Sequence, residues 1–218
     1  DMEPAERARR VMEFADRLSQ QAVRLAMMES MDSGGIIART GTEVLLGGTM
    51  IRNLAHYAAT RFPWREEIPI PGNPFIPGRN YIRREPIGVC VGIVPWNFPM
   101  TMALWKIAQA IIMGNSIVLK PATNTPLSAL IMAEVAQASP IPKGVINVIA
   151  GMGGDLGKTL CTHPEVDRIA FTGSTEVGRT IMKLAADTIK RVTLELGGKS
   201  ANIILDDADL DLAVDGGL

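Results

Sequence analysis

The sequence predicts an α/β fold: a doubly wound, mainly parallel sheet with a helical N-terminal layer and a protruding β-arm. Two observations support this prediction. Between Val89 and Leu205, short apolar runs alternate with amphipathic helical patterns, which is the order that parallel βαβ units require. The runs are apolar at nearly every position, as in strands that are buried on both faces. We expect about five strands.

The N-terminal part, residues 1–66, is expected to be a helical scaffold. Apolar residues between Pro4 and Ser30 recur at three- and four-residue steps, which is the spacing of one face of a helix. Gly34 and Gly35 end that helix, and a second helical pattern follows. The apolar positions are Val11, Phe14, Leu18, Ala22 and Leu25 in the first pattern and Val44, Ile51, Leu54 and Ala58 in the second.

Residues 67–87 are expected to form the β-arm, because the stretch from Ile68 to Pro86 is rich in Pro and Gly. Proline cannot donate to a β-ladder, so this stretch suits a hairpin or an edge strand rather than a central strand. An arm of this kind either makes contacts between subunits or is a plain surface loop. The residues alone leave both interpretations open.

Residues 88–218 are expected to form the Rossmann-like core. Thr125 before Pro126 predicts a helix start, with Thr as the N-cap and Pro at the first helical position. Asp206 or Asp207 is expected to cap a last helix. The predicted strands are VCVGIVPW, SIVLK, GVINVIA, RIAFTG, RVTLELGG and SANIILD, and the predicted helices are MTMALWKIAQAIIM, TPLSALIMAEVAQAS, Asp155 to Cys161 and TEVGRTIMKLAADT.

Composition and charge exclude several classes of protein. The formal net charge of -1 gives no signal for binding to nucleic acid or to an anionic membrane. No apolar run approaches the roughly 18 residues that span a bilayer, and the first residues lack the apolar segment of a signal peptide. We therefore expect a cytoplasmic protein. Because the chain opens on Asp1 rather than Met, we expect either a fragment or a trimmed product.

Metal and disulfide chemistry are not expected. His56 and His163 have no partners at ligand spacing. Cys90 and Cys161 lie in apolar surroundings, which is typical of buried free thiols. The acidic stretch DDADLDLAVDGG lacks the Gly and the final Glu that an EF-hand calcium loop needs.

Two strand ends carry residues that suit proton transfer and charge stabilisation, and each residue also has a plain structural explanation. Glu195, followed by Gly197 and Gly198, is either a general base, if it is partly desolvated, or a cap of the glycine turn. Asn97 is held between prolines in VPWNFP. Its amide is either a donor to a developing oxyanion or an ordinary turn residue.

Two further strand ends suit a phosphate-bearing ligand. Lys120 is either a donor to ribose hydroxyls or phosphate, or an exposed lysine. The stretch FTGSTEVG, Phe171 to Gly178, joins a strand end to a helix start. The free N–H groups and the dipole of such a start favour phosphate, although an N-capped helix with a Gly turn explains the residues equally. Ligands of doubly wound sheets bind outside the carboxyl ends of the strands.

In their order along the chain, these motifs resemble those of the NAD(P)-dependent aldehyde dehydrogenase superfamily. The motifs are VPWNFP, KPAT followed by TPL after Asn124, FTGSTEVG and VTLELGGKSANII, and the resemblance covers essentially the whole chain. The resemblance implies an oxidoreductase that converts an aldehyde to a carboxylic acid with NAD or NADP. In that family a cysteine thiolate attacks the aldehyde, hydride passes to nicotinamide, and activated water hydrolyses the thioester.

The resemblance also assigns roles to single residues. Glu195 matches the general base, and Asn97 matches the side-chain donor of the oxyanion hole. Lys120 matches the lysine that binds the adenosine ribose. The other expected cofactor contacts are Gly173 and Ser174 at the pyrophosphate, Gly178 in close helix packing, Gly153 beside the adenine, and Pro95, Trp96 and Leu196 along the cofactor cleft.

This chain departs from the family pattern in two ways. Many members that prefer NAD carry Glu three residues after the ribose lysine, whereas this chain has Thr123. Without that carboxylate, a 2′-phosphate meets no repulsion and Lys120 can pair with it, so we expect that NADP is accepted. The nucleophilic cysteine of the family lies beyond the last residue of this chain, and neither Cys90 nor Cys161 fits its place.

The expected function is therefore aldehyde oxidation by an enzyme of which this chain is the cofactor-binding portion. The alternative is a non-catalytic nucleotide-binding fragment that needs a separate C-terminal catalytic portion. In either case the chain alone is expected to be inactive. The arm resembles the oligomerisation hairpin of the family, so a homodimer or homotetramer is expected. The aldehyde stays unnamed, because only the helix with Met100, Met102 and Trp105 lines the near wall of the substrate funnel.

Overall fold

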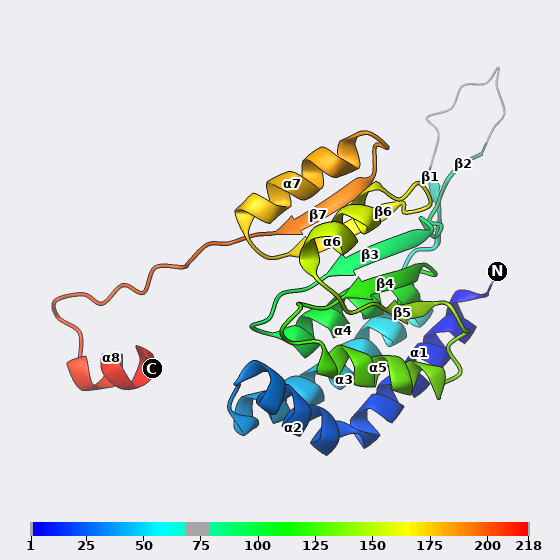
Figure 1. The fold of residues 1–218 in the computed structure, drawn as a ribbon. Helices are drawn as coiled ribbons and strands as arrows, with labels where there is room; N and C mark the ends of the chain where they lie inside the picture. Colours follow the sequence, from blue (N-terminus) through cyan, green and yellow to red (C-terminus); the bar gives the residue numbers. More distant parts are fainter. Residues whose placement is uncertain (1, 69–78, 218) are drawn as a thin grey trace.

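The computed structural model of the chain describes residues 2–68 and 79–217. A layer of N-terminal helices and a parallel sheet covered by further helices form the body, and a hairpin and a C-terminal extension project from it (Figure 1). The N-terminal helices are α1 (Pro4–Gln20), α2 (Ala22–Ser33) and α3 (Ile37–Thr60).

The sheet confirms the predicted doubly wound α/β fold. Its five strands are all parallel, in the order β5-β4-β3-β6-β7. The chain starts at the central strand, winds outward to one edge, and then returns to build the other edge. The strands are β3 (Val89–Ile93), β4 (Ser116–Lys120), β5 (Ile146–Val148), β6 (Arg168–Thr172) and β7 (Arg191–Glu195).

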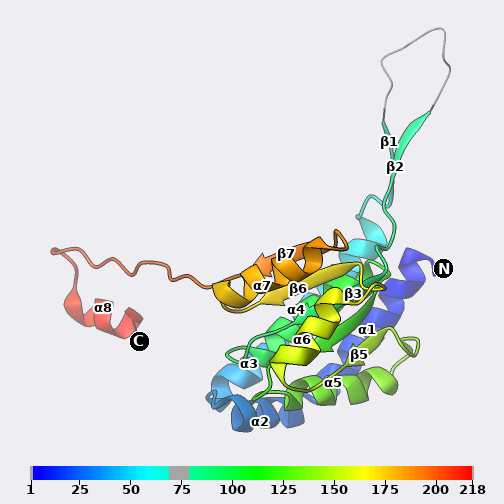
Figure 2. The ribbon, with the colours of Figure 1, turned by 45° about the horizontal axis from the view of Figure 1, so that its top comes forward.

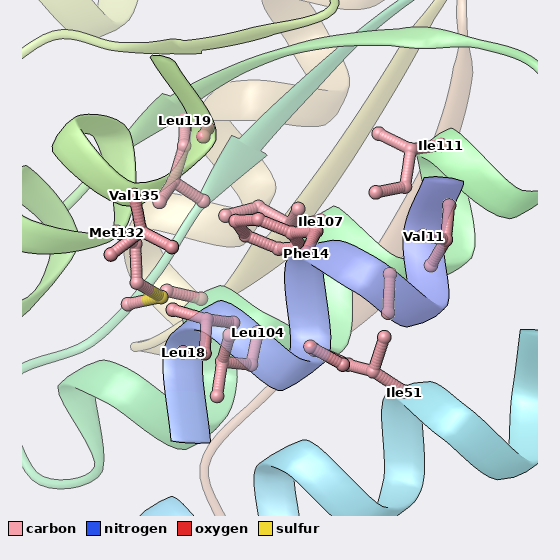
Figure 3. Packing of buried hydrophobic residues seen from close by; sticks show 14 of the residues in the cluster. Val11, Phe14, Leu18, Ile51, Leu104, Ile107, Ile111, Leu119, Met132 and Val135 are labelled. Atoms are coloured by element: carbon pink, nitrogen blue, oxygen red, sulfur yellow. The ribbon is translucent and has the colours of Figure 1, made fainter. Parts of the chain in front are cut away.

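Helices cover both faces of the sheet (Figure 2). Two helices pack between the sheet and the N-terminal layer, where Phe14 of α1 lies against Ile107 (Figure 3). The other two enclose a smaller core on the opposite face, which includes Ile169, Phe171 and Ile181. The first pair is α4 (Pro99–Ile112) and α5 (Leu127–Gln137), and the second is α6 (Gly153–Thr162) and α7 (Thr175–Ala186).

The base of the predicted arm is a β-hairpin. Strands β1 (Arg65–Ile68) and β2 (Asn80–Arg83) pair antiparallel, with Arg65 opposite Arg83. The hairpin projects away from the sheet and its helices (Figures 1 and 2). Residues 69–78 of the predicted arm lie outside the described residues.

The C-terminal end differs from the prediction. The sequence predicts a strand in SANIILD, but residues 200–206 form no strand, and this segment leads away from the body (Figures 1 and 2). The outer edge of β7 is open in the described sheet, but this segment does not pair with it. A strand without a partner is not stable in water. The apolar residues Ile203, Ile204 and Leu205 of this segment are exposed. The chain then forms the last helix, α8 (Leu210–Gly217).

Two helix boundaries also differ. The single helix predicted from Pro4 to Ser30 is broken at Gln21, which leaves helical geometry (φ -95°, ψ 12°) so that α1 and α2 both pack against α3. The last helix is capped by Asp209, whose Oδ1 accepts a hydrogen bond from the Leu212 amide at 3.1 Å, and not by Asp206 or Asp207. Among the helices described, none is long and apolar enough to cross a membrane.

Candidate functional site

The carboxyl ends of four strands meet at one edge of the sheet. Ile93 of β3 is in register with Lys120 on one side and with Phe171 on the other, and Thr172 is in register with Glu195. The chain winds away from β3 in opposite directions, so β3 is the topological switch point where doubly wound sheets bind their ligands. All four predicted motifs therefore begin at this edge.

The loop from β3 to α4 carries Asn97. The Val94 amide donates to the Lys120 carbonyl oxygen at 3.2 Å, which ties the loop to β4. Pro95 is half-buried, whereas Trp96 and Asn97 are exposed. The Asn97 side chain makes no hydrogen bond to any other described residue, so its amide is free to donate to a bound oxygen.

The end of β4 buries Lys120, so the alternative of an exposed lysine is wrong. Its side chain is only 4% exposed, and burial lowers the pKa of its ammonium group. Nζ donates to the Pro121 carbonyl oxygen at 3.1 Å, although an ammonium group can donate three hydrogen bonds. Thr123 Oγ1 donates to the Gly151 carbonyl oxygen at 3.2 Å. That contact joins this loop to the start of α6 at Gly153.

The start of α5 differs from the prediction that Thr125 is its N-cap. The helix begins at Leu127, and Pro126 occupies the N-cap position without a side-chain hydrogen bond. The predicted cap, Thr125, has a buried hydroxyl that finds no partner among the residues described. The Leu127 amide instead donates to Asp32 Oδ2 of α2 at 2.8 Å. The cap therefore comes from a residue far away in the sequence.

Strand β6 passes into α7 through Gly173 and Ser174. Ser174 is the N-cap, and its Oγ accepts a hydrogen bond from the Val177 amide at 3.3 Å. A Cβ at Gly173 would lie 2.5 Å from the aromatic ring that precedes it by two residues, and a Cβ at Gly178 would lie 2.6 Å from Leu196. Both glycines thus allow close packing that a larger residue would disturb. The other free amides of this helix start face the edge where the motifs meet.

Glu195 ends β7 and lines a cavity of about 920 Å³. The cavity lies between α4 and the face of β6 and β7 that is opposite α7. Met102 and Trp105 of α4 line it as well. No hydrogen bond joins the Glu195 carboxylate to the following glycine turn within the described chain, so the geometry gives no support to the turn-cap interpretation. The carboxylate faces a space that a water molecule or a small ligand can enter.

Lys106 is a candidate that the sequence analysis did not identify. Its Nζ donates to Thr172 Oγ1 at 3.0 Å, and both residues line the same cavity as Glu195. Burial lowers the pKa of Lys106, and the negative charge of Glu195 partly offsets this effect. A signal was present in the sequence, because Lys106 is the single charged residue of α4. A lone charge in an apolar helix needs a partner inside the fold.

Neither cysteine lies beside Glu195, although Cys90 lines another part of the same cavity. Cys90 is in register with Arg168, which is in register with Arg191, four residues before Glu195 on β7. At the rise of a strand this separation is about 13 Å. Cys161 is buried in the core on the opposite face of the sheet. Burial raises the pKa of both free thiols, which disfavours the thiolate that a nucleophile needs.

Comparisons with known proteins agree with this arrangement. The model of the aldehyde dehydrogenase family matches residues 1–218. DhaS of Bacillus subtilis (strain 168) is 47% identical over 220 residues, which are 100% of this chain and 43% of that protein. A double mutant of betaine aldehyde dehydrogenase from Staphylococcus aureus in complex with NAD+ matches with a TM-score of 0.92 at 38% identity, over 100% of this chain and 42% of that one.

A further solved structure, an NADP dependent enzyme of E. coli, has a TM-score of 0.90 at 37% identity and covers 99% of this chain and 44% of that one. The chain therefore spans less than half the length of the relatives that it matches. The family match and the similarity of fold both extend over all or nearly all of the described body. The chain belongs to the aldehyde dehydrogenase family.

Proposed function

We propose that the chain is the cofactor-binding portion of an enzyme that oxidises an aldehyde to a carboxylic acid with NAD+ or NADP+. The reaction passes through a thioester on a cysteine outside this chain. The observation that carries the proposal is the meeting of Asn97, Lys120, Gly173 and Glu195 at one edge of the sheet, around the switch point at β3.

Glu195 and Asn97 perform the chemistry that belongs to this chain. Glu195 is the general base, because its carboxylate borders a cavity and can take a proton from the water that attacks the thioester. Asn97 donates a hydrogen bond to the substrate oxygen that gains negative charge in the transition state. Lys106 lines the same cavity as Glu195, and the negative charge of Glu195 partly offsets the lowering of the Lys106 pKa by burial.

The edge of the sheet fits a dinucleotide, which accepts the hydride when it is bound. The amides after Gly173 and Ser174 at the start of α7 would hold the pyrophosphate. Lys120 donates to the adenosine ribose, because its ammonium group has spare donors. Gly153 would lie beside the adenine, and the space there is open, since a Cβ on Gly153 would find no atom within 4 Å. The remaining proposed contacts are Pro95, Trp96, Gly178 and Leu196.

Thr123 leads us to propose that NADP is accepted as well as NAD. A threonine hydroxyl carries no charge, so it does not repel a 2′-phosphate, and Lys120 is in the same loop region to pair with that phosphate. The relatives support either cofactor, since one neighbour is in complex with NAD+ and another is an NADP dependent enzyme. Titration of both cofactors decides the question. NAD bound more than about tenfold tighter than NADP, ~1.4 kcal/mol, contradicts NADP acceptance.

The second candidate is a nucleotide-binding fragment without catalysis of its own. It is favoured by the distance of both cysteines from Glu195 and by the coverage of only 43% of DhaS. The test is aldehyde-dependent NAD(P)H formation by the purified 218-residue chain, alone and after addition of a C-terminal portion. We expect weak cofactor binding and no oxidation by the chain alone, and oxidation after the addition. Activity of the chain alone contradicts the proposal and returns attention to Cys90 and Cys161.

We further propose that residues 1–66 and 88–218 form one cofactor-binding unit and that the arm of residues 67–87 mediates assembly into a homodimer or homotetramer. The projection of the β1–β2 hairpin away from the body supports this role (Figure 2). Light scattering of the complete enzyme measures its mass, and a monomer mass contradicts the proposal. A cytoplasmic location remains a prediction.

A further inference from the structure

The loops that carry Asn97 and Lys120 are held from outside by carboxylates of α2. We infer that Glu29 and Asp32 are positioning residues, Glu29 for the oxyanion donor Asn97 and Asp32 for the cofactor loop after Lys120. This inference rests on the proposed function of both loops. Neither α4 nor α5 has a side-chain cap of its own. The missing caps are supplied by one helix that is far away in the sequence.

Glu29 caps α4. Its Oε1 accepts a hydrogen bond from the Met100 amide at 3.0 Å, and the bond is buried. Pro99, the first residue of α4, has no amide hydrogen, so Met100 provides the first amide of the helix that needs an acceptor. Asn97 lies three residues before this amide. A shift of the helix start therefore moves the Asn97 side chain relative to the strand ends.

Asp32 caps α5 in the same way. It lies three residues after Glu29, so both carboxylates are on one face of α2. Its Oδ2 accepts from the Leu127 amide at 2.8 Å, and Leu127 is the first residue of α5. The loop before this cap begins at Lys120 and includes Thr123. One face of α2 thus sets the starts of both helices that follow the strand ends.

Helix α3 adds a second hold on the Asn97 loop. Glu43 Oε2 accepts from Thr101 Oγ1 at 2.9 Å, and Glu43 Oε1 lies 3.1 Å from Arg39 Nε. The Arg39 guanidinium lies 4.8 Å from the centre of the Phe98 ring. Three of the four residues that follow Asn97 are therefore contacted by α2 or α3, while Asn97 itself stays exposed and free to act.

The chemistry of Glu29 indicates positioning rather than stability alone. The residue is 0% exposed and forms no salt bridge within the described chain; burial raises its pKa, and the Ser128 side chain of α5 and the Met100 amide act against this rise. A buried carboxylate without a cation costs free energy, and an apolar side chain of similar size would cost less. What an apolar side chain cannot supply is a fixed acceptor for the Met100 amide. The role of the Glu29 carboxylate is therefore to fix the position of the Met100 amide at the start of α4.

A crossed experiment on the complete enzyme tests the inference. Glu29→Ala is expected to lower kcat by roughly 10–100-fold with the Kd for NAD almost unchanged. Asp32→Ala is expected to raise the Kd for NAD by about five- to tenfold with little change in kcat. Glu29→Gln is expected to restore kcat, because its carbonyl oxygen accepts the same bond. Equal effects of both Ala variants on both constants, or no rescue by Gln, overturn the inference.

Hydrogen exchange of the 218-residue chain gives a readout that needs no activity. Glu29→Ala should speed exchange at the start of α4 alone, and Asp32→Ala at the start of α5 alone. The matched control is Glu134→Ala, which breaks an exposed ion pair between α2 and α5 (Arg24 to Glu134, 2.9 Å) away from both caps. It should change neither helix start. Uniform acceleration in either Ala variant contradicts the inference. If the crossed exchange pattern is seen but the complete wild-type enzyme oxidises no aldehyde, only the proposed function is contradicted.

Discussion

The two halves of the sheet on either side of β3 hold their carboxyl ends in different ways. On the β4 side, Lys120 is buried, and α2 caps the helices that follow β3 and β4. On the β7 side, Glu195 is exposed and faces an open cavity. The residues after Glu195 lead away from the body (Figure 2). The β4 side is internally supported, whereas the β7 side, which carries the proposed general base and the proposed pyrophosphate contacts Gly173 and Ser174, is open.

Under the proposed function, this difference indicates where a C-terminal portion of the enzyme would act. The exposed apolar side chains of residues 203–205 resemble a surface that another portion covers. The face of β6 and β7 beside the cavity is also polar, and there Arg168 donates to Thr193 Oγ1 at 2.8 Å. Nucleotide binding should therefore depend mainly on this chain, whereas turnover should depend on what closes the cavity. Variants on the two sides of the sheet should accordingly differ in how much they reduce cofactor binding and turnover.

The largest effect is expected for Glu195→Gln in the complete enzyme. The amide keeps the shape of the side chain but cannot take a proton, so thioester hydrolysis should slow by roughly 10²–10⁴-fold. Cofactor affinity should be almost unchanged, because Glu195 is not among the proposed cofactor contacts. Rapid-quench kinetics with a separate cofactor titration measure both quantities. Normal turnover would remove Glu195 from the mechanism.

Asn97→Ala should follow. Loss of one donor to the developing oxyanion costs about 2.7–4 kcal/mol of transition-state stabilisation, a 10²–10³-fold loss of kcat. The variant lies on the supported half, so its fold and its melting temperature should match those of the wild type. Steady-state kinetics together with a thermal melt provide the check. A parallel loss of kcat and of folded protein would mean that Asn97 is only a turn residue.

The sequence could predict the strand ends because each is a local pattern. Short apolar runs followed by Pro, Gly or Lys define where a strand stops, and a parallel sheet places all such ends at one edge. Asn97, Lys120, Gly173 and Glu195 could thus be grouped without coordinates. The family resemblance then assigned their roles.

Contacts between distant segments could not be predicted in this way. Glu29 and Met100 are 71 residues apart, and no periodicity links them. The predicted cap Thr125 follows a sound local rule, but the Asp32 carboxylate supplies the acceptor from another helix. The strand predicted in SANIILD failed for a related reason, since its apolar pattern is strand-like but the segment pairs with no strand of the described sheet. Local patterns predict elements, and packing decides their partners.

A smaller effect is expected for Gly178→Ala, which tests the proposed cofactor contacts on the β7 side. Alanine favours the helix by about 1 kcal/mol over glycine, but its Cβ displaces Leu196, which is 41% exposed and can rotate away. Stability should therefore stay equal or rise, while cofactor binding weakens about fivefold, ~1 kcal/mol. Gly157→Ala in α6 is the matched control, because its Cβ would meet no atom within 4 Å. Equal binding losses in the two variants would refute the role of the Leu196 contact.

The smallest effect is expected for the pH dependence of stability in Glu29→Gln. Burial raises the pKa of Glu29, and the charges of Glu43 on α3 and Asp32 on α2 raise it further, whereas Ser128 and the Met100 amide act in the opposite direction. The folded state therefore binds the proton more tightly than the unfolded state does. Stability from this group is complete below the unfolded pKa, near 4.3, and is lost as the pH rises toward the folded pKa. Glutamine has no such dependence, so the variant should melt about 2–4 °C higher than the wild type at pH 8 and less so at pH 5. Melting curves at both pH values measure the difference. A stability gain that is larger at pH 5 than at pH 8 contradicts a raised pKa of Glu29 in the folded protein.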